Sequence, residues 1–217
     1  MSGYEYDLVI VGSGGAAFAA AIRARDHGAK VAMVERATVG GTCVNVGCVP
    51  SKALLAAAHT AHTAGHHRFA GIGADAPRID VAEVIAAKDE LVEHMRQAKY
   101  LDLSESYGFP ILHGGARFAD PDTLLVDGQP VSAGAFVLAT GADAKVPDLP
   151  GIGEVDYLTS TTSMELTAPP PRLVTIGAGY VGAEQSQLWS QLGSQVTLVG
   201  RLAPAPNPSS LRCWPRR

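Results

Sequence analysis

The sequence of 217 residues predicts an α/β protein with a parallel sheet. The order strand, glycine-rich turn, helix, strand occurs twice, around residue 12 and around residue 177. Parallel strands need such crossovers, which are usually helical. Between residues 111 and 137, short β-like runs alternate with turn residues, and this pattern predicts a small antiparallel meander with hairpin turns. The predicted architecture is therefore a three-layer domain followed by the beginning of a second, similar domain.

The first repeat begins with a β-branched strand, Tyr6–Val11, and a turn at Gly12–Gly15. An alanine-rich helix over Ala16–Gly28, which ends at a glycine, and the strand Val31–Glu35 complete it. The amphipathic stretch Val81–Tyr107 predicts one or two exposed helices.

The second repeat comprises the strand Leu173–Ile176, a helix from about Tyr180 to Leu192, and the strand Gln195–Val199. We therefore expect one domain over residues 1–150 and the beginning of another over 151–202. Residues 203–217 are rich in proline and arginine and have no periodicity, so we expect an aberrant or disordered tail.

The composition excludes several functions. A net charge of −4 without a run of lysines or arginines argues against nucleic acid and anionic membranes. No apolar run reaches the roughly 18 residues of a membrane span, and the first apolar segment lacks the basic start of a signal peptide. Three cysteines are too few for a secreted disulfide framework, so we expect a cytoplasmic protein.

The first glycine turn has the pattern of a dinucleotide site. Gly12, Gly14 and Gly15 allow a tight turn and close approach of a pyrophosphate, and Ala17 allows close packing of helix on strand. Glu35, 23 residues after Gly12, can accept hydrogen bonds from a ribose. The alternative is an ordinary glycine turn, which the combination of strand, helix and acid disfavours.

The second turn repeats the pattern with Gly177, Gly179 and Gly182. Gly200 occupies the position of the ribose-binding acid, and Arg201 follows it. An arginine without that acid suits a 2′-phosphate and favours NADP over NAD; alternatively, Arg201 is a solvated surface charge.

Cys43 and Cys48 form a close pair just after the first repeat, in GGTCVNVGCVPSK at residues 40–52. Zinc is the competing interpretation, but no second Cys or His pair stands at zinc spacing, and the histidines 59, 62, 66 and 67 look like a polar surface run that follows a helix. A redox disulfide is favoured. Because Cα atoms five residues apart in a helix are about 8–9 Å apart, beyond the roughly 7 Å limit of a disulfide, the segment must begin irregularly. Gly40, Gly41, Gly47 and Pro50 supply that irregularity.

The segment GGTCVNVGCVPSK resembles the redox-active segment of the class I pyridine nucleotide-disulfide oxidoreductases, which include glutathione reductase, dihydrolipoamide dehydrogenase and mercuric reductase. The resemblance implies FAD at the first nucleotide site and NADPH or NADH at the second, and it places Gly41, Thr42 and Lys52 at the flavin. VLATGA, residues 137–142, resembles the strand and turn that return to the flavin, which adds Thr140 and Gly141 to that site.

Within the family, GSGGAA at 12–17, ERATVGGTC and ARFADPDTLLVDG are most like mercuric reductases. This implies NADPH-dependent reduction of Hg(II) to Hg(0), with a lipoamide- or glutathione-type disulfide reductase as the alternative. Cys48 would face the flavin as the charge-transfer thiolate, and Cys43 would meet the substrate or the metal. Lys52 would pair with Glu184 beside the flavin, and Tyr180 would cover the nicotinamide pocket; a surface ion pair of little energetic value is the alternative for Lys52 and Glu184.

Family members are homodimers that continue through a C-terminal dimerisation domain, and the resemblance therefore implies a truncated chain with impaired activity. A flavin- or metal-binding remnant without turnover is the other expectation.

Overall fold

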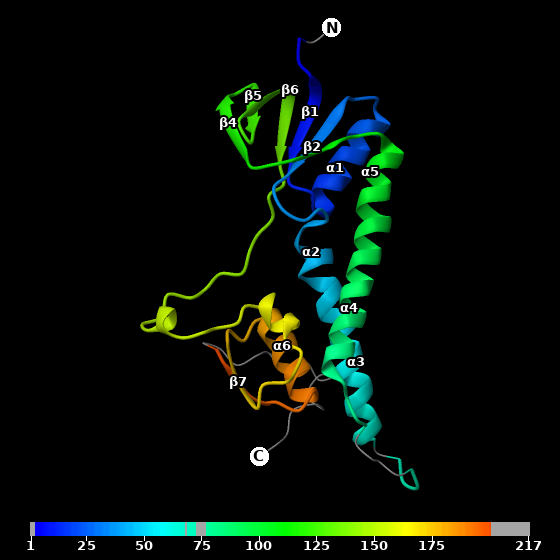
Figure 1. Cartoon of the computed structure of the whole chain (residues 1–217), viewed down its shortest axis with the longest axis vertical. Coiled ribbons are helices and arrows are strands. Elements are labelled where there is room, and N and C mark those ends of the chain that lie inside the picture. Colours follow the sequence, from blue (N-terminus) through cyan, green and yellow to red (C-terminus); the bar gives the residue numbers. More distant parts are fainter. Residues whose placement is uncertain (1–2, 68, 73–76, 201–217) are drawn as a thin grey trace. The chain divides into compact units, whose positions relative to one another are not determined.

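The computed structural model describes residues 3–67, 69–72 and 77–200, in two compact units (Figure 1). Unit 1 comprises residues 1–53 and 86–161, and unit 2 comprises residues 54–85 and 162–217. The boundaries fall within α3 (Cys48–Gly65) and α4 (Val81–Arg96). The division at residues 150 and 202 stays a prediction.

Unit 1 is built on a six-stranded sheet with the order β3-β2-β1-β6-β5-β4. The strands β1, β2, β3 and β6 pair in parallel, whereas β4, β5 and β6 form an antiparallel meander. The long strand β6 takes part in both, since residues 129–132 pair with β5 and residues 133–138 pair with β1. The bounds are β1 Tyr6–Val11, β2 Val31–Glu35, β3 Ile111–His113, β4 Ala116–Asp120, β5 Thr123–Val126 and β6 Gln129–Leu138.

One part of the predicted meander is wrong. Ile111–His113 pairs in parallel with β2, from Met33 to Glu35, and does not join the antiparallel strands. A strand that returns after a helix commonly lies parallel to the strand before it. The periodicity of a short β-like run does not reveal which neighbour it will pair with.

The sheet of unit 1 has a covered layer on each face, as predicted. Ile10 and Met33 pack against Phe18 of helix α1 (Gly15–Asp26). On the opposite face, Val9 and Val34 belong to a buried cluster with residues of the meander. Neighbouring residues of a strand point to opposite faces, so β1 and β2 contribute to both cores.

The stretch predicted as one or two exposed helices is α4, a five-residue π-helical segment η1 (Gln97–Leu101) and α5 (Asp102–Tyr107). It is not exposed throughout, because Val92 and Ser104 are buried. Tyr100 in η1 makes an edge-to-face contact with Phe18 at 4.9 Å between ring centroids. A π-helical turn holds more residues than an α-helical one, so η1 changes which residues face α1.

Unit 2 contains the second predicted strand, glycine turn, helix and strand. β7 (Arg172–Ile176) and β8 (Gln195–Val199) pair in parallel, with α6 (Tyr180–Gln191) between them. Its core includes Leu54, Leu188 and the fully buried Trp189. No helix in the described part of the chain is both long and apolar enough to cross a membrane.

Candidate functional site

The glycine turn after β1 leaves no room for a side chain at its first position. Gly12 has φ +107°, and a Cβ there would lie 2.2 Å from the carbonyl oxygen of Ala139. The Ala139 N–H donates to the Val11 carbonyl at 2.8 Å. The carboxyl ends of β1 and β6 therefore meet at this turn, and parallel α/β sheets bind ligands at such ends.

Helix α1 begins at Gly15 without a side-chain cap from Gly14. A Cβ at Gly14 would have its nearest neighbour at 3.8 Å, and one at Gly15 would meet nothing within 4 Å. The space above the helix N-terminus is thus open, with the positive end of the helix dipole and backbone N–H donors beside it. Ala17, fully buried, packs α1 against the sheet.

A chain of hydrogen bonds fixes the predicted acid. The Ser13 hydroxyl donates to Glu35 Oε2 at 2.6 Å, and the Ala37 N–H donates to Oε1 at 2.8 Å. The Gly40 N–H donates to the same Ser13 hydroxyl at 3.1 Å. Glu35 is partly exposed, and its carboxylate is held in one orientation at the end of β2.

The cysteine segment begins irregularly, as predicted. It consists of a short helix α2 (Gly41–Asn45), a break at residues 46–47, and α3, which begins at Cys48. Gly41 has φ +67°, and a Cβ there would lie 2.6 Å from the Cα of Gly14. The nucleotide turn and the cysteine segment are therefore in backbone contact. A Cβ at Gly47 would lie 2.8 Å from the Thr42 carbonyl oxygen, so Gly47 allows α3 to begin close to α2.

Both thiols are exposed, and they interact. Partial burial raises the pKa of Cys43, and a hydrogen bond with the Cys48 side chain and the charge of Cys48 raise it further. A hydrogen bond from the Cys48 backbone acts in the opposite direction and lowers the pKa of Cys43. Burial and then the charge of Cys43 raise the pKa of Tyr100, so the phenol of η1 lies within electrostatic reach of this thiol.

The predicted returning turn lies at the same place. A Cβ at Gly12 would lie 3.3 Å from the Cα of Thr140. The Thr42 hydroxyl donates to the Ala142 carbonyl at 3.3 Å, and a Cβ at Gly141, where φ is +71°, would lie 3.9 Å from that hydroxyl. The structure thus brings three predicted segments of unit 1 together, and they comprise Gly12–Gly15, Gly41–Thr42 and Thr140–Gly141.

The second glycine turn makes the same backbone hydrogen bond to its neighbouring strand as the first. The Gly177 N–H donates to Val199 O at 2.8 Å, as the Gly12 N–H does to Val34 O. This equivalence aligns Gly200 with Glu35. A Cβ at Gly200 would lie 2.4 Å from the Cβ of Ala178, so the turn has no room for an acidic side chain there. Arg201 lies outside the described residues.

The residues of this turn differ in what surrounds them. A Cβ at Gly182 would lie 1.8 Å from the Gly177 carbonyl oxygen, whereas one at Gly179 would meet nothing within 4 Å. Tyr180, the first residue of α6, is 82% exposed. Lys52 lies on α3 in unit 1 and Glu184 on α6 in unit 2, and their pairing stays a prediction.

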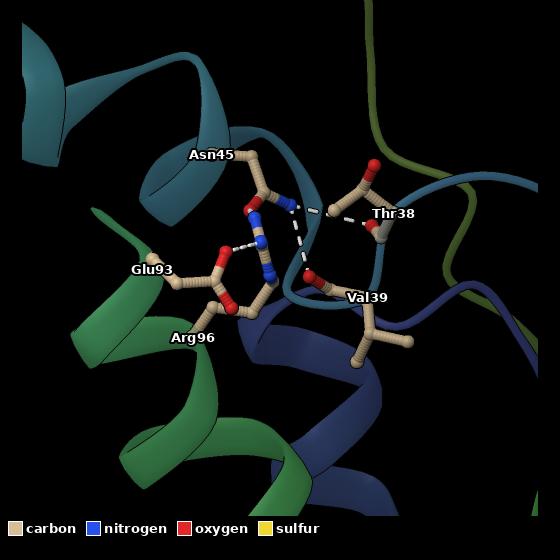
Figure 2. A network of polar contacts seen from close by, with 5 residues as sticks. All are labelled: Thr38, Val39, Asn45, Glu93 and Arg96. Atoms are coloured by element: carbon tan, nitrogen blue, oxygen red, sulfur yellow. Dashed lines mark hydrogen bonds and ion pairs between the residues drawn. The ribbon is translucent and has the colours of Figure 1, made fainter. Parts of the chain in front are cut away.

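The sequence did not predict a polar network around Asn45 (Figure 2). Asn45, between Cys43 and Cys48, donates through Nδ2 to the carbonyls of Thr38 at 3.3 Å and Val39 at 3.0 Å. Arg96 of α4 donates through Nη1 to Asn45 Oδ1 at 3.2 Å and pairs through Nη2 with Glu93. Neither the spacing of Arg96 from the cysteines, about 50 residues away, nor its residue type signals this contact.

The histidines near the cysteines are placed differently from the expectation. His59 and His62 lie inside α3 and do not follow a helix. The ring of His62 stacks on that of His66 at 4.3 Å between centroids, and burial, followed by the charges of His66 and His59, lowers the pKa of His62. Within the described residues, no group of three or more His, Cys, Asp and Glu side chains could hold a metal ion.

A glycine turn joined to a close thiol pair, followed by a second glycine turn, defines a class of nucleotide-dependent redox enzyme. The chain belongs to the pyridine nucleotide-disulphide oxidoreductase family, whose sequence profile matches residues 6–206. Its members are FAD-dependent NAD(P)H oxidoreductases.

Among its relatives are mercuric reductases. The chain is 54% identical over 202 residues to that of Streptomyces lividans and 52% identical over 197 residues to that of Staphylococcus aureus. These alignments cover 90% and 91% of the chain but 43% and 36% of the relatives, so the chain spans well under half of their length. Among solved structures, the HOCl-induced flavoprotein disulfide reductase RclA of Escherichia coli superimposes with a TM-score of 0.76 at 29% identity, over 89% of this chain and 41% of that one.

Proposed function

We propose that this chain provides the flavin site and the thiol pair of an NADPH-dependent mercuric reductase, with Hg(II) as the substrate and Cys43–Cys48 as the redox disulfide. The observation that carries the proposal is the backbone contact between Gly14 and Gly41. It places a dinucleotide turn directly against the segment that holds two interacting thiols. The identity to mercuric reductases over nine-tenths of the chain favours this substrate.

The residues present fit FAD. The open N-terminus of α1 and the space at Gly14 would take the pyrophosphate, and Glu35 would accept hydrogen bonds from the ribose. Thr42, Thr140 and Gly141 would line the same cradle. When bound there and reduced by NADPH, the flavin would supply the electron pair that opens the Cys43–Cys48 disulfide.

For the second cofactor, Gly177 and Gly179 would take the pyrophosphate of NADPH. The absence of room for an acid at Gly200 supports NADPH over NADH, because no carboxylate can stand where a 2′-phosphate would bind. Arg201 is the proposed phosphate-binding residue, Tyr180 the proposed cover of the nicotinamide pocket, and Lys52 with Glu184 the proposed pair beside the flavin.

The thiols suit a soft metal ion. Thiolates are the competent ligands and prefer soft cations such as Hg(II). The pKa of Cys43 is raised by burial and by Cys48. A metal ion that replaces the proton removes this penalty, since it leaves no unpaired negative charge beside the second sulfur. Cys43 and Cys48 together would hold Hg(II) between two sulfur atoms.

Flavin binding is tested with Gly14→Ala. A methyl group at Gly14 has ordinary space in the protein, and φ of −79° is allowed for alanine, so the variant should fold. It should lose FAD because the methyl group occupies the pyrophosphate approach. The matched control is Gly28→Asn, at the C-terminal end of α1 away from the cradle, where φ is +80° and a Cβ meets nothing within 4 Å; it should retain FAD. Unchanged FAD content in Gly14→Ala would contradict the site.

The substrate is tested on the FAD-loaded chain after NADPH has reduced the cysteine pair. Hg(II) is then titrated in the presence of a competing thiol. We expect one Hg(II) per chain, lost in Cys43→Ser and in Cys48→Ser. Replacement of the third cysteine of the sequence, Cys213→Ser, should retain it. Reduction of oxidised glutathione or lipoamide without tight Hg(II) binding would instead support the organic disulfide alternative.

A further inference from the structure

We infer that Asn45 and Arg96 are positioning residues that hold the two thiols at disulfide-forming separation and so set the reduction potential of the pair. This inference rests on the proposed redox role of Cys43 and Cys48. None of the hydrogen bonds in this network involves a sulfur atom. They tie Asn45, which lies between the cysteines in the sequence, to the loop carbonyls of residues 38 and 39 and to Arg96 (Figure 2).

Helix α2 is too short to be stable by itself. It has five residues, far below the roughly 12–15 at which an isolated helix becomes even marginally stable. It is followed at once by the break at residues 46–47. The position of Cys43 relative to Cys48 therefore depends on contacts that α2 makes with other parts of unit 1.

Asn45 supplies the most direct of these contacts. It is the last residue of α2, and its amide donates to two successive carbonyls of the loop that leads into α2. The beginning and the end of the segment are thereby tied together. A Cβ at Gly40 would lie 2.5 Å from Val44 Cγ1 and 3.4 Å from Asn45 Nδ2, so the loop packs tightly against the same two residues.

Arg96 fixes the orientation of the Asn45 side-chain amide. Its Nη1 donates to Asn45 Oδ1, which orients Nδ2 towards the loop carbonyls. The Arg96 side chain is 22% exposed, and Glu93, which pairs with it, is 61% exposed. A hydrogen bond from a partly buried guanidinium is stronger than one between neutral groups. The segment between the thiols is thus anchored to α4, a 16-residue helix.

A disulfide forms only within a narrow range of Cα separation and orientation. Two thiols held in that range react as if at high local concentration. When the anchor is removed, the reduced pair samples other separations, and forming the disulfide must then restrict that freedom. The disulfide should become harder to form and easier to reduce.

The experiment measures the equilibrium of the pair with glutathione in a Cys213→Ser background. In the oxidising direction, Cys43 and Cys48 lose two electrons and two protons and form one S–S bond, while one oxidised glutathione takes up both and gives two reduced glutathiones. Acid quenching, alkylation and mass spectrometry count the thiols. No flavin is required.

We expect Arg96→Met and Asn45→Asp each to lower the equilibrium constant for disulfide formation about tenfold, which is about 30 mV towards a more oxidising pair. Asn45→Asp keeps the acceptor for Arg96 but loses both donors to the loop. The matched control is Gln97→Met, at the next residue, which is exposed and whose side-chain amide donates to Asp102 Oδ1 and not to Asn45. It should stay within about twofold of the parent, as surface substitutions do.

Arg96→Lys keeps a charged donor and should fall between the parent and Arg96→Met, which provides a measurement even where Asn45→Asp does not fold. Equal potentials in the parent, Arg96→Met and Arg96→Lys would overturn the inference, as would an equal shift in Gln97→Met. If the parent forms no Cys43–Cys48 disulfide at all, the proposed redox function fails, and the inference fails with it.

Discussion

At the scale of single residues, Ser13 shows what spacing alone does not predict. Gly12, Gly14 and Glu35 could be predicted as a nucleotide motif because their separations follow from the turn and the strand that frame it. Ser13 stands at a variable position of that motif, yet it is buried and joins Glu35 to Gly40. Its role depends on the loop that brings Gly40 beside it, a contact across 27 residues.

Ser13→Ala should therefore lower the free energy of unfolding by about 1.5–3 kcal/mol, because it removes a hydrogen bond to a carboxylate. The Gly40 N–H loses the Ser13 hydroxyl but keeps the Ser13 carbonyl as an acceptor at 3.2 Å. Urea denaturation measures the effect. Ser132→Ala is the matched control: its exposed hydroxyl accepts one N–H, from Glu5, and its loss should cost about 0.5 kcal/mol or less. Equal costs in the two variants would show that Ser13 does not link the two segments.

The interaction between the two thiols predicts how the reactivity of Cys43 depends on pH. The side chain of Cys48 raises the pKa of Cys43 by a hydrogen bond and by charge, whereas its backbone lowers it. Cys48→Ala removes the two raising effects and keeps the backbone N–H. The rate of Cys43 alkylation by iodoacetamide, which follows the thiolate, should then reach half of its plateau at a lower pH than in the reduced parent chain without flavin. A midpoint that moves to higher pH would contradict this account.

At the scale of elements, both strand–turn–helix–strand repeats could be predicted, because β-branched runs, glycines and helical periodicity coincide in each. The pairing of Ile111–His113 could not, since three residues carry too little pattern to choose between a parallel and an antiparallel neighbour. The π-helical segment at Gln97–Leu101 could not be predicted either, because no pattern in the sequence indicates it. Tyr100 in this segment packs on Phe18, a tertiary contact that a local sequence pattern does not show.

Two substitutions in the second glycine turn distinguish a glycine that is needed for packing from one that has open space around it. Gly182→Ala should destabilise unit 2 by about 1–3 kcal/mol, because the methyl group would overlap the Gly177 carbonyl. Gly179→Ala has φ of −74° and open space, so it should change stability by about 1 kcal/mol or less. Thermal unfolding followed by circular dichroism measures both. NADPH affinity should fall in both variants, and a Gly182→Ala chain as stable as the parent would contradict the close packing.

At the scale of the whole molecule, residues 54–85 group with the C-terminal part of the chain. The sequence predicted two domains that follow one another along the chain, because a sequence pattern does not show which core a helix joins. Leu54 and Ile85 pack in the same cluster as Leu188 and Trp189, more than a hundred residues later. Such long-range packing depends on three-dimensional shape, and the predicted boundary at residue 150 remains to be tested by limited proteolysis.

The buried cluster of unit 2 shares no residue with the two buried clusters of unit 1, which predicts a separate unfolding transition for each unit. Trp189 is fully buried in unit 2, and a Trp214→Phe background makes its fluorescence the sole tryptophan signal. Leu188→Ala should lower the stability reported by Trp189 by about 2–5 kcal/mol through loss of buried volume. Leu124→Ala, equally buried in unit 1, should leave that signal within about 0.5 kcal/mol of the parent. Equal shifts in both variants would show a single cooperative transition.

The contact between Gly14 and Gly41 also restricts how this protein could be redesigned. The two positions are 27 residues apart, yet they compete for one volume, so the first side chain admitted at residue 41 displaces the backbone at residue 14. In a combinatorial library randomised at both positions, folded variants should be nearly confined to glycine at 41, whatever occupies 14, and variants that also bind FAD should be confined to glycine at both. A thiol segment transplanted from another scaffold would have to bring its own glycine turn, because the nucleotide loop and the thiol segment behave as a single exchangeable module.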